Sequence, residues 1–203
     1  MHAKQLWKNI VQEKINAQHQ VLVATNTAEG DALAEMIKRI KSGDPENTEA
    51  QAARRYWPML MGKDFLRDVD AQGANSLLNY GYAILRATVA RAIISVGLHP
   101  SLGVHHQNRL NAFCLVDDMM EPYRPAVDFT VFNLLRSGHT GVTADTKKSL
   151  VGLMQQQVRM PQEITSISNA VLYSAQSLVQ CFTEGKKKLV FPEQIIPQAP
   201  DIE

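Results

Sequence analysis

The sequence has few cysteines and no excess of charge of either sign. Cys114 and Cys181 are the two cysteines among 203 residues, and they form no CxxC pair. We therefore expect no zinc or disulfide framework, but two buried, reduced thiols in a cytoplasmic protein. The 21 basic and 20 acidic residues leave a formal net charge of +1. This total gives no support for nucleic-acid binding, although it does not exclude a local basic patch.

Long apolar runs and a secretory signal are also missing. The longest apolar stretch, residues 83–96, is interrupted by Arg86 and Arg91, so it is too short and too charged to cross a bilayer. Residues 1–4 carry neither the apolar core nor the cleavage site of a signal peptide. Apolar residues make up 45% and charged residues 20%, which is typical of a soluble globular protein of one large or two small domains.

Apolar residues recur at helical spacing along most of the chain. In the first segment Leu6, Ile10, Val11 and Ile15 share one face of a helix. We therefore predict an all-α fold with no sheet of three or more strands. The composition changes near its end, which separates a helical domain of residues 1–185 from a basic and proline-containing tail of residues 186–203. We expect helices over residues 4–25, 33–40, 75–96, 113–136, 143–159 and 161–185, and a further helix from residue 48.

Two of these helices have features that bear on function. Residues 48–51, Thr-Glu-Ala-Gln, match a capping box, so we expect Thr48 to cap the helix that Pro58 then kinks or ends. Glu49 in its first turn is most simply a favourable acid at a helix N-terminus. Pro122 and Pro125 are expected to kink the helix over residues 113–136.

Acidic residues and histidines gather near the start of that later helix. Asp117 and Asp118 stand four and three residues before Glu121, so either pair with Glu121 shares a helical face. A cation between them would remove their repulsion, whereas the simpler interpretation is an acidic turn that favours the helix dipole. His105 and His106 precede the helix, and at most one of them should reach a shared metal. One imidazole with several carboxylates suits Mg²⁺ or Mn²⁺ better than a structural zinc.

Basic residues occur in two short stretches. Arg54, Arg55 and Lys63 surround two aromatic residues downstream of Glu49, and residues 186–188 are three consecutive lysines. Each stretch is compatible with a solvated face or with contacts to nucleic-acid phosphates, and the sequence pattern does not decide between them.

Several stretches together resemble one known family. The stretches are KQLWKNIVQEKI, SGDPENTEAQAARRYWPMLMG, NSLLNYGYAILRATVARAI, LGVHHQNRLNAF, DDMMEPYRPAVD and KKKLVFPE. In order and spacing they are similar to the type II version of the CRISPR-associated spacer-acquisition integrase (Cas-one) family, and the resemblance covers nearly the whole chain.

The resemblance implies the helical catalytic domain of a metal-dependent DNA endonuclease and integrase. Such an enzyme inserts spacer DNA into a CRISPR array by transesterification, as part of immunity against phage and plasmid DNA. It implies Glu49, His106 and Glu121 as catalytic residues, and the same three with Asp118 as ligands of Mg²⁺ or Mn²⁺. Asp118 is expected to be a ligand or to support one. The histidine is His106 because it ends the GxxH pattern.

The resemblance also implies partners. These are double-stranded and branched DNA, the second CRISPR-associated protein (Cas-two) and a second copy of the chain, with no membrane. Arg54, Arg55, Lys63, Lys186, Lys187 and Lys188 are the expected DNA contacts.

The β-rich dimerising domain that begins typical family members has no counterpart here. We therefore expect a fragment or a naturally minimal form that integrates poorly as a monomer. Two other interpretations stay open: a non-catalytic module that binds DNA or a partner, and a helical-bundle metallohydrolase acting on small phosphates. The second lacks the paired Glu-x-x-His motifs of such bundles.

Overall fold

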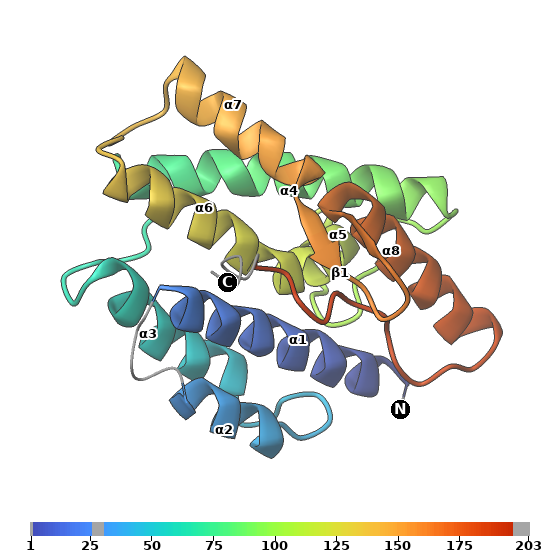
Figure 1. Cartoon of the computed structure of the whole chain (residues 1–203). Coiled ribbons are helices and arrows are strands. Elements are labelled where there is room, and N and C mark those ends of the chain that lie inside the picture. The colour runs from blue at the N-terminus through green and yellow to red at the C-terminus, as the bar shows by residue number, and fades with distance from the viewer. Residues whose placement is uncertain (1, 26–30, 197–203) are drawn as a thin grey trace.

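The computed structural model describes residues 2–25 and 31–196, and it is helical apart from two short strands (Figure 1). The predicted all-α fold is therefore confirmed. The α-helices are α1 His2–Ala24, α2 Asp31–Arg39, α3 Thr48–Met61, α4 Ala74–Ser95, α5 Cys114–Met120, α6 Arg124–Arg136, α7 Ala144–Gly152 and α8 Ile167–Thr183. The 3₁₀ turns are η1 Glu121–Tyr123 and η2 Leu153–Gln155, and the strands are β1 Gln157–Arg159 and β2 Ile164–Ser166.

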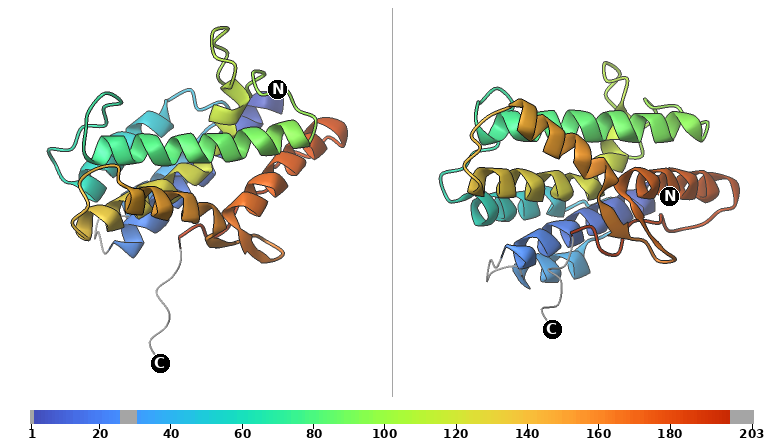
Figure 2. Two further views of the ribbon diagram at one scale, coloured as in Figure 1. Left: turned by 90° about the horizontal axis from the view of Figure 1, so that it is seen from above. Right: turned by 45° about the horizontal axis from the view of Figure 1, so that its top comes forward.

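Helix α1 lies against the elements that form the candidate functional site. It contacts α2 and α3 on one side and α6 and η1 on another. Figures 1 and 2 show α4, α6 and α1 in succession, with α8 packed against α4. The apolar face predicted for α1 is confirmed, because Leu6, Ile10, Val11 and Ile15 are all fully buried. Burial of each such side chain contributes about 1.5–3 kcal/mol.

Helices α4 and α6 approach each other closely at one glycine. A Cβ atom built on Gly81 would lie 2.4 Å from Cγ1 of Val127, well inside van der Waals contact. The absence of a side chain at Gly81 therefore lets α4 pack against α6, the helix that follows the acidic segment.

The chain between α7 and α8 departs from the predicted helices. Residues 153–155 form η2, and β1 and β2 then pair antiparallel, with Val158 opposite Thr165. The helix predicted to reach residue 159 therefore ends at Gly152, and the last three residues of its predicted range form β1. Helix α8 begins only at Ile167, where Ser166 Oγ accepts a hydrogen bond from the Asn169 amide. Within the described residues no sheet has more than two strands.

The start of α3 also differs from prediction, and of the two outcomes expected at Pro58, a kink or an end, the helix does not end there. Asn47 is the N-cap, and the Asp44 carboxylate accepts hydrogen bonds from the amides of Thr48 and Glu49, 2.8 and 3.0 Å long. Thr48 is therefore not the cap. Pro58 lies inside the helix, which runs on to Met61, because a proline removes only one backbone hydrogen bond when its neighbours hold the helix in place.

Pro122 divides the helix in which we predicted a kink. The single helix expected over residues 113–136 is divided into α5, η1 and α6, with Pro122 in the 3₁₀ turn. Asp117 and Asp118 lie on α5, and Glu121 opens the 3₁₀ turn that directly follows it.

The end of the described chain packs into the core. Leu189, Phe191 and Ile195 are buried, and the Leu189 amide donates a 2.7 Å hydrogen bond to Asn9 Oδ1 on α1. Residues 197–203 of the predicted tail lie outside the described residues. Both cysteines are buried and unpaired, as predicted. None of the helices described is long and apolar enough to span a membrane.

A buried carboxyl group, Asp128, links α6 to α3 and α4. Tyr56 donates a 3.0 Å hydrogen bond to Asp128 Oδ2, and Tyr82 donates one to Oδ1. Burial raises the pKa of Asp128 to about 7, and the two hydrogen bonds and the charge of Arg124 oppose this increase only in part. The folded protein therefore holds a proton that the unfolded chain releases near pH 4.

We expect the free energy of unfolding to decrease between pH 5 and pH 7 because of Asp128. The native state binds more protons in this window, so stability is lost as the pH rises. The variant Asp128→Asn cannot titrate, and its amide can still pair with two tyrosine hydroxyls, so its stability should decrease less. Urea unfolding of both proteins at pH 5, 6, 7 and 8 measures the difference. Parallel curves for the two proteins would contradict the expectation.

Candidate metal centre and adjoining cleft

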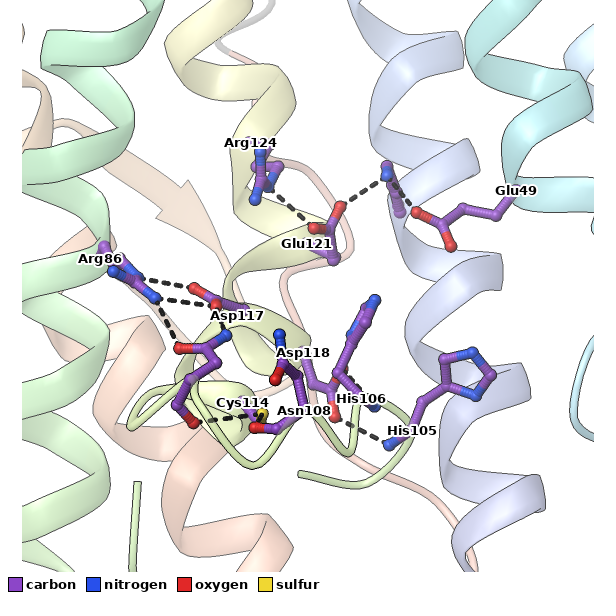
Figure 3. Close-up of polar contacts among 12 residues, drawn as sticks. Glu49, Arg86, His105, His106, Asn108, Cys114, Asp117, Asp118, Glu121 and Arg124 are labelled. Carbon is purple, nitrogen blue, oxygen red and sulfur yellow. Dashed lines mark hydrogen bonds and ion pairs between the residues drawn. The ribbon is translucent and has the colours of Figure 1, made fainter. Parts of the chain in front are cut away.

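Two glutamates from distant parts of the chain meet at one ammonium group. Lys14 Nζ on α1 lies 2.5 Å from Glu49 Oε1, in the first turn of α3, and 2.5 Å from Glu121 Oε2 in η1. Figure 3 shows the carboxylates of Glu49 and Glu121 pointing toward each other across this position. On its other oxygen Glu121 pairs with Arg124 Nε at 2.9 Å.

This cluster is charged and largely shielded from water. The side chains of Lys14, Glu49 and Glu121 are 12%, 24% and 8% exposed. Burial acts to raise the pKa of Glu121, but the positive charges of Lys14 and Arg124 outweigh it and hold that pKa below its usual value. Burial acts to lower the pKa of Lys14, and the two glutamates outweigh it in the same way. Glu121 is therefore ionised and Lys14 protonated at neutral pH.

Asp118 holds the histidine loop. Its side chain is fully buried, and it accepts a 2.8 Å hydrogen bond from the His105 amide and a short one from His106 Nδ1. The hydrogen bond to Asp118 raises the pKa of His106, against the effect of burial. With Nδ1 bound, Nε2 is the ring nitrogen left to face other groups, and Figure 3 shows the ring extending toward the two glutamates.

The rings of the two adjacent histidines meet edge to face, with 5.3 Å between centroids, and both contact Trp7. The His105 ring stacks on Trp7 of α1, with 4.2 Å between centroids and an angle of 5° between planes. The His106 ring meets the same tryptophan at its edge, 5.6 Å away. Only His106 is therefore directed toward the glutamates, as expected for neighbouring loop residues.

Asp117 does not share a cation with Asp118 or Glu121. It forms an ion pair with Arg86 of α4 at 2.6 Å and accepts a 2.7 Å hydrogen bond from Asn111. Asp117, Asp118 and Glu121 thus each face a different partner: Arg86, His106 and Lys14. The cation that Glu121 shares with a second carboxylate in this structure is the Lys14 ammonium, and that second carboxylate is Glu49.

A polar cleft of about 470 Å³ opens beside the cluster. Arg86 from α4 and Arg124 from the start of α6 line it together with Asp117 and Glu121, the carboxylates with which they pair. Its lining includes Asn79, Arg86, His106, Asn111, Glu121 and Arg124. A groove with guanidinium and amide donors is suited to binding phosphate oxygens.

The donor set fits a hard divalent cation. Among the described residues, no group of three or more His, Cys, Asp or Glu side chains is arranged to hold a metal ion in this conformation. The reason is visible in the geometry, because Lys14 Nζ lies between Glu49 and Glu121. Glu121 Oε2 is buried and accepts no well-directed hydrogen bond from any described residue, despite the nearby ammonium. Carboxylate oxygens with an imidazole nitrogen are ligands of the kind that Mg²⁺ and Mn²⁺ accept.

The basic residues singled out from the sequence lie in two places. Arg54 and Arg55 of α3 and Lys63 just beyond it are exposed, as are residues 186–188 after α8. Figures 1 and 2 place α3 and the end of α8 at opposite sides of the molecule. Lys186 also pairs with Glu184 at 3.2 Å.

Sequence reasoning missed Lys14, Arg86 and Arg124. For Lys14 a signal was available, since it stands three and four residues after Val11 and Ile10, on the apolar face of the helix. A lysine that a helix carries into the core must find a negative partner there.

Fold and site together define a helical protein with a histidine and carboxylate cluster beside an arginine-lined cleft. The chain belongs to the Cas1 family: the family model "CRISPR associated protein Cas1" matches residues 2–160. A CRISPR-associated endonuclease Cas1 from Neisseria meningitidis is 36% identical over 199 residues, which cover 96% of this chain and 64% of that protein. Another from Saccharolobus solfataricus is 40% identical over 100 residues, 46% of this chain and 33% of that one.

Solved structures share the fold. A casposase bound to its integration product has a TM-score of 0.78 at 24% identity, covering 98% of this chain and 67% of the other. A CAS1 protein from Thermotoga maritima has a TM-score of 0.73 at 19% identity, covering 88% and 65%. The chain thus spans less than two thirds of the length of the curated relatives described above.

Proposed function

We propose that this chain is the helical catalytic part of a Cas1-type DNA endonuclease and integrase, which inserts spacer DNA into a CRISPR array. One observation carries the proposal. Glu49 and Glu121 share the ammonium group of Lys14, beside His106, which the buried carboxylate of Asp118 orients. Family membership and the endonuclease names of the relatives support it.

The proposed reaction is a transesterification. The oxygen of a DNA 3′ hydroxyl loses its proton and bonds to a phosphorus in the backbone of the target strand. The bond between that phosphorus and the 3′ oxygen of the target strand breaks, and the displaced oxygen takes up a proton. With water in place of the hydroxyl, the same geometry nicks the strand. Glu49, Glu121 and His106 would hold Mg²⁺ or Mn²⁺, which polarises the phosphoryl oxygen and stabilises charge at phosphorus.

We assign the remaining residues of the site to orientation and binding. Asp118 is directed at His106 Nδ1 and the loop amides, so it acts through His106 rather than as a ligand, in the manner of the carboxylates that orient metal-binding histidines. Arg86 and Arg124 line the cleft, where their guanidinium groups are placed to contact DNA phosphates.

We propose partners from the complexes in which structurally similar proteins occur. One neighbour is a casposase bound to an integration product, and others are Cas6-RT-Cas1–Cas2 complexes. We propose that the whole protein works on double-stranded and branched DNA in the cytoplasm, with a Cas2 partner and as a homodimer. Two-ended integration needs two active sites at a fixed separation, so one copy of this chain should perform it poorly.

The test is a strand-transfer assay with the purified chain, Mn²⁺ and a labelled branched DNA. The expected products are single-ended joining and nicking that disappear when the metal is chelated. Binding of the same DNA without any metal-dependent product would support a non-catalytic module instead. Efficient two-ended integration by a demonstrably monomeric sample would contradict the expected need for two copies.

We expect DNA binding to weaken steeply with salt. If about six phosphate contacts form through residues such as Arg54, Arg55 and Lys63, affinity should fall roughly a thousandfold between 50 and 200 mM salt. The double variant Arg54→Glu, Arg55→Glu should weaken binding to all sequences alike and reduce the salt slope by about 2. Fluorescence anisotropy across a salt series measures both effects.

The matched control is Lys147→Glu with Lys148→Glu on α7, which makes the same change in net charge on two exposed residues away from α3. It should leave the salt slope unchanged. Equal losses in both double variants would show that net charge, rather than a face on α3, governs binding.

A further inference from the structure

The ammonium of Lys14 stands where the two glutamates would share a metal ion. Its distances to Glu49 Oε1 and Glu121 Oε2 are both 2.5 Å, and its side chain is only 12% exposed. Two carboxylates held this close in a shielded place repel each other unless a cation lies between them. Lys14 therefore supplies the charge that the folded, metal-free protein needs at this point.

The same position makes Lys14 a competitor for the metal. A carboxylate oxygen 2.5 Å from an ammonium nitrogen cannot also be a ligand of an ion in that space. A divalent ion between Glu49 and Glu121 therefore requires Lys14 Nζ to move, and binding must supply the free energy of that movement. Leaving the ammonium buried without a partner would be costly, so it needs another acceptor.

The structure contains such a second place. A cavity of about 120 Å³ is lined by Lys14 itself together with Gln18, Tyr82 and Asp128, and also by Arg67 and Arg124, which pair with Asn75 and Glu121. Gln18 lies one helical turn after Lys14 on α1, and side chains four residues apart on a helix are neighbours. Gln18 Oε1 is buried and has no hydrogen-bond partner among the residues described. Both oxygens of Asp128 at the same cavity already accept hydrogen bonds from Tyr56 and Tyr82, so Gln18 Oε1 is the acceptor that the ammonium can reach.

We propose that Lys14 is an internal cation with two positions: between Glu49 and Glu121 when no metal is bound, and at Gln18 in the neighbouring cavity when a metal takes its place. The inference rests on the proposed metal site and adds to it a residue that sets the affinity of that site. Lys14 keeps the glutamates together in the metal-free protein and restricts occupation of the site to divalent ions that bind strongly enough to displace it.

The experiment is calorimetric titration of Mn²⁺ into the purified chain and its variants. Lys14→Met removes the competing charge and should raise the affinity for Mn²⁺ by roughly tenfold, within the usual range for coupled binding events. Lys14→Arg keeps the charge and holds carboxylates through a two-pronged guanidinium, so it should lower the affinity. Lys8→Met, a loss of charge elsewhere on α1, is the matched control and should change nothing.

The second position is tested by combining variants. Gln18→Leu removes the acceptor and should lower the Mn²⁺ affinity about fivefold when Lys14 is present. In the Lys14→Met background the same change should have no effect, and this non-additivity is the signature of the proposed coupling. Additive effects of the two changes would overturn the second position.

Thermal unfolding in a chelator gives a readout that does not involve metal or DNA. Lys14→Met should lower the melting temperature of the metal-free chain, and excess Mn²⁺ should restore it. If Lys14→Met does not fold, Lys14→Arg and Gln18→Leu still test the inference. Unchanged Mn²⁺ affinity in a folded Lys14→Met, or in both other variants, would overturn it. Failure of the unaltered chain to bind Mn²⁺ would instead remove the proposed function.

Discussion

The variant Glu121→Gln is expected to lose more than about 100-fold in strand transfer and nicking. Loss of a residue that merely orients a metal ligand typically costs 10–100-fold, so removal of a charged ligand should cost more. The Glu121 carboxylate is buried, ionised and paired with Lys14 and Arg124. Glutamine keeps its size but removes its charge, so the loss should arise in the site rather than in the fold.

Product formation in single-turnover assays and Mn²⁺ titration measure this effect together. Both the rate and the affinity should fall, because an amide oxygen is a weaker ligand than a carboxylate. Glu35→Gln on α2 is the matched control, since that side chain is 57% exposed and pairs with Lys38 on the surface. Near-normal activity of Glu121→Gln would exclude Glu121 as a ligand.

The variant Gly103→Ala is expected to lose about 100-fold in activity although it touches no reacting group. A Cβ atom at Gly103 would lie 2.2 Å from the carbonyl oxygen of His106 and 3.0 Å from Asp118 Oδ2. The backbone of the histidine loop must shift to admit it, which moves His106 relative to Glu121. A displacement of about 1 Å in a catalytic arrangement can cost about 100-fold.

The matched control is Gly141→Ala, because a Cβ there meets no atom within 4 Å. It should keep full activity, whereas Gly103→Ala should lose Mn²⁺ affinity and activity while its circular dichroism spectrum remains helical. Normal Mn²⁺ affinity in Gly103→Ala would mean that the loop accommodates the methyl group without moving His106.

Helices with unbroken apolar periodicity could be predicted well from local sequence. The face of α1 that carries Ile10 and Ile15 is buried as predicted, and α4 begins and ends within one residue of its expected bounds. Prediction was wrong around Pro161, where helices were expected on both sides and a hairpin forms instead. Pro58 lies inside α3, whereas Pro161 lies between the two strands of a hairpin, and local sequence does not distinguish these cases because neighbouring elements decide which backbone path each proline takes.

The candidate site, like the fold, could be predicted from the sequence only in part. The sequence by itself determined the helical fold class and, through resemblance alone, indicated Glu49, His106, Asp118 and Glu121. Spacing along the chain could not, because it relates residues within one helix, whereas the site joins α1, α3, η1 and a loop. Only the tertiary structure decided that Asp118 turns toward His106, that Asp117 pairs with Arg86, and that Lys14 lies between the two glutamates. The physical reason is that buried charges must be neutralised by whichever opposite charges packing brings within reach, and packing is a property of the whole chain.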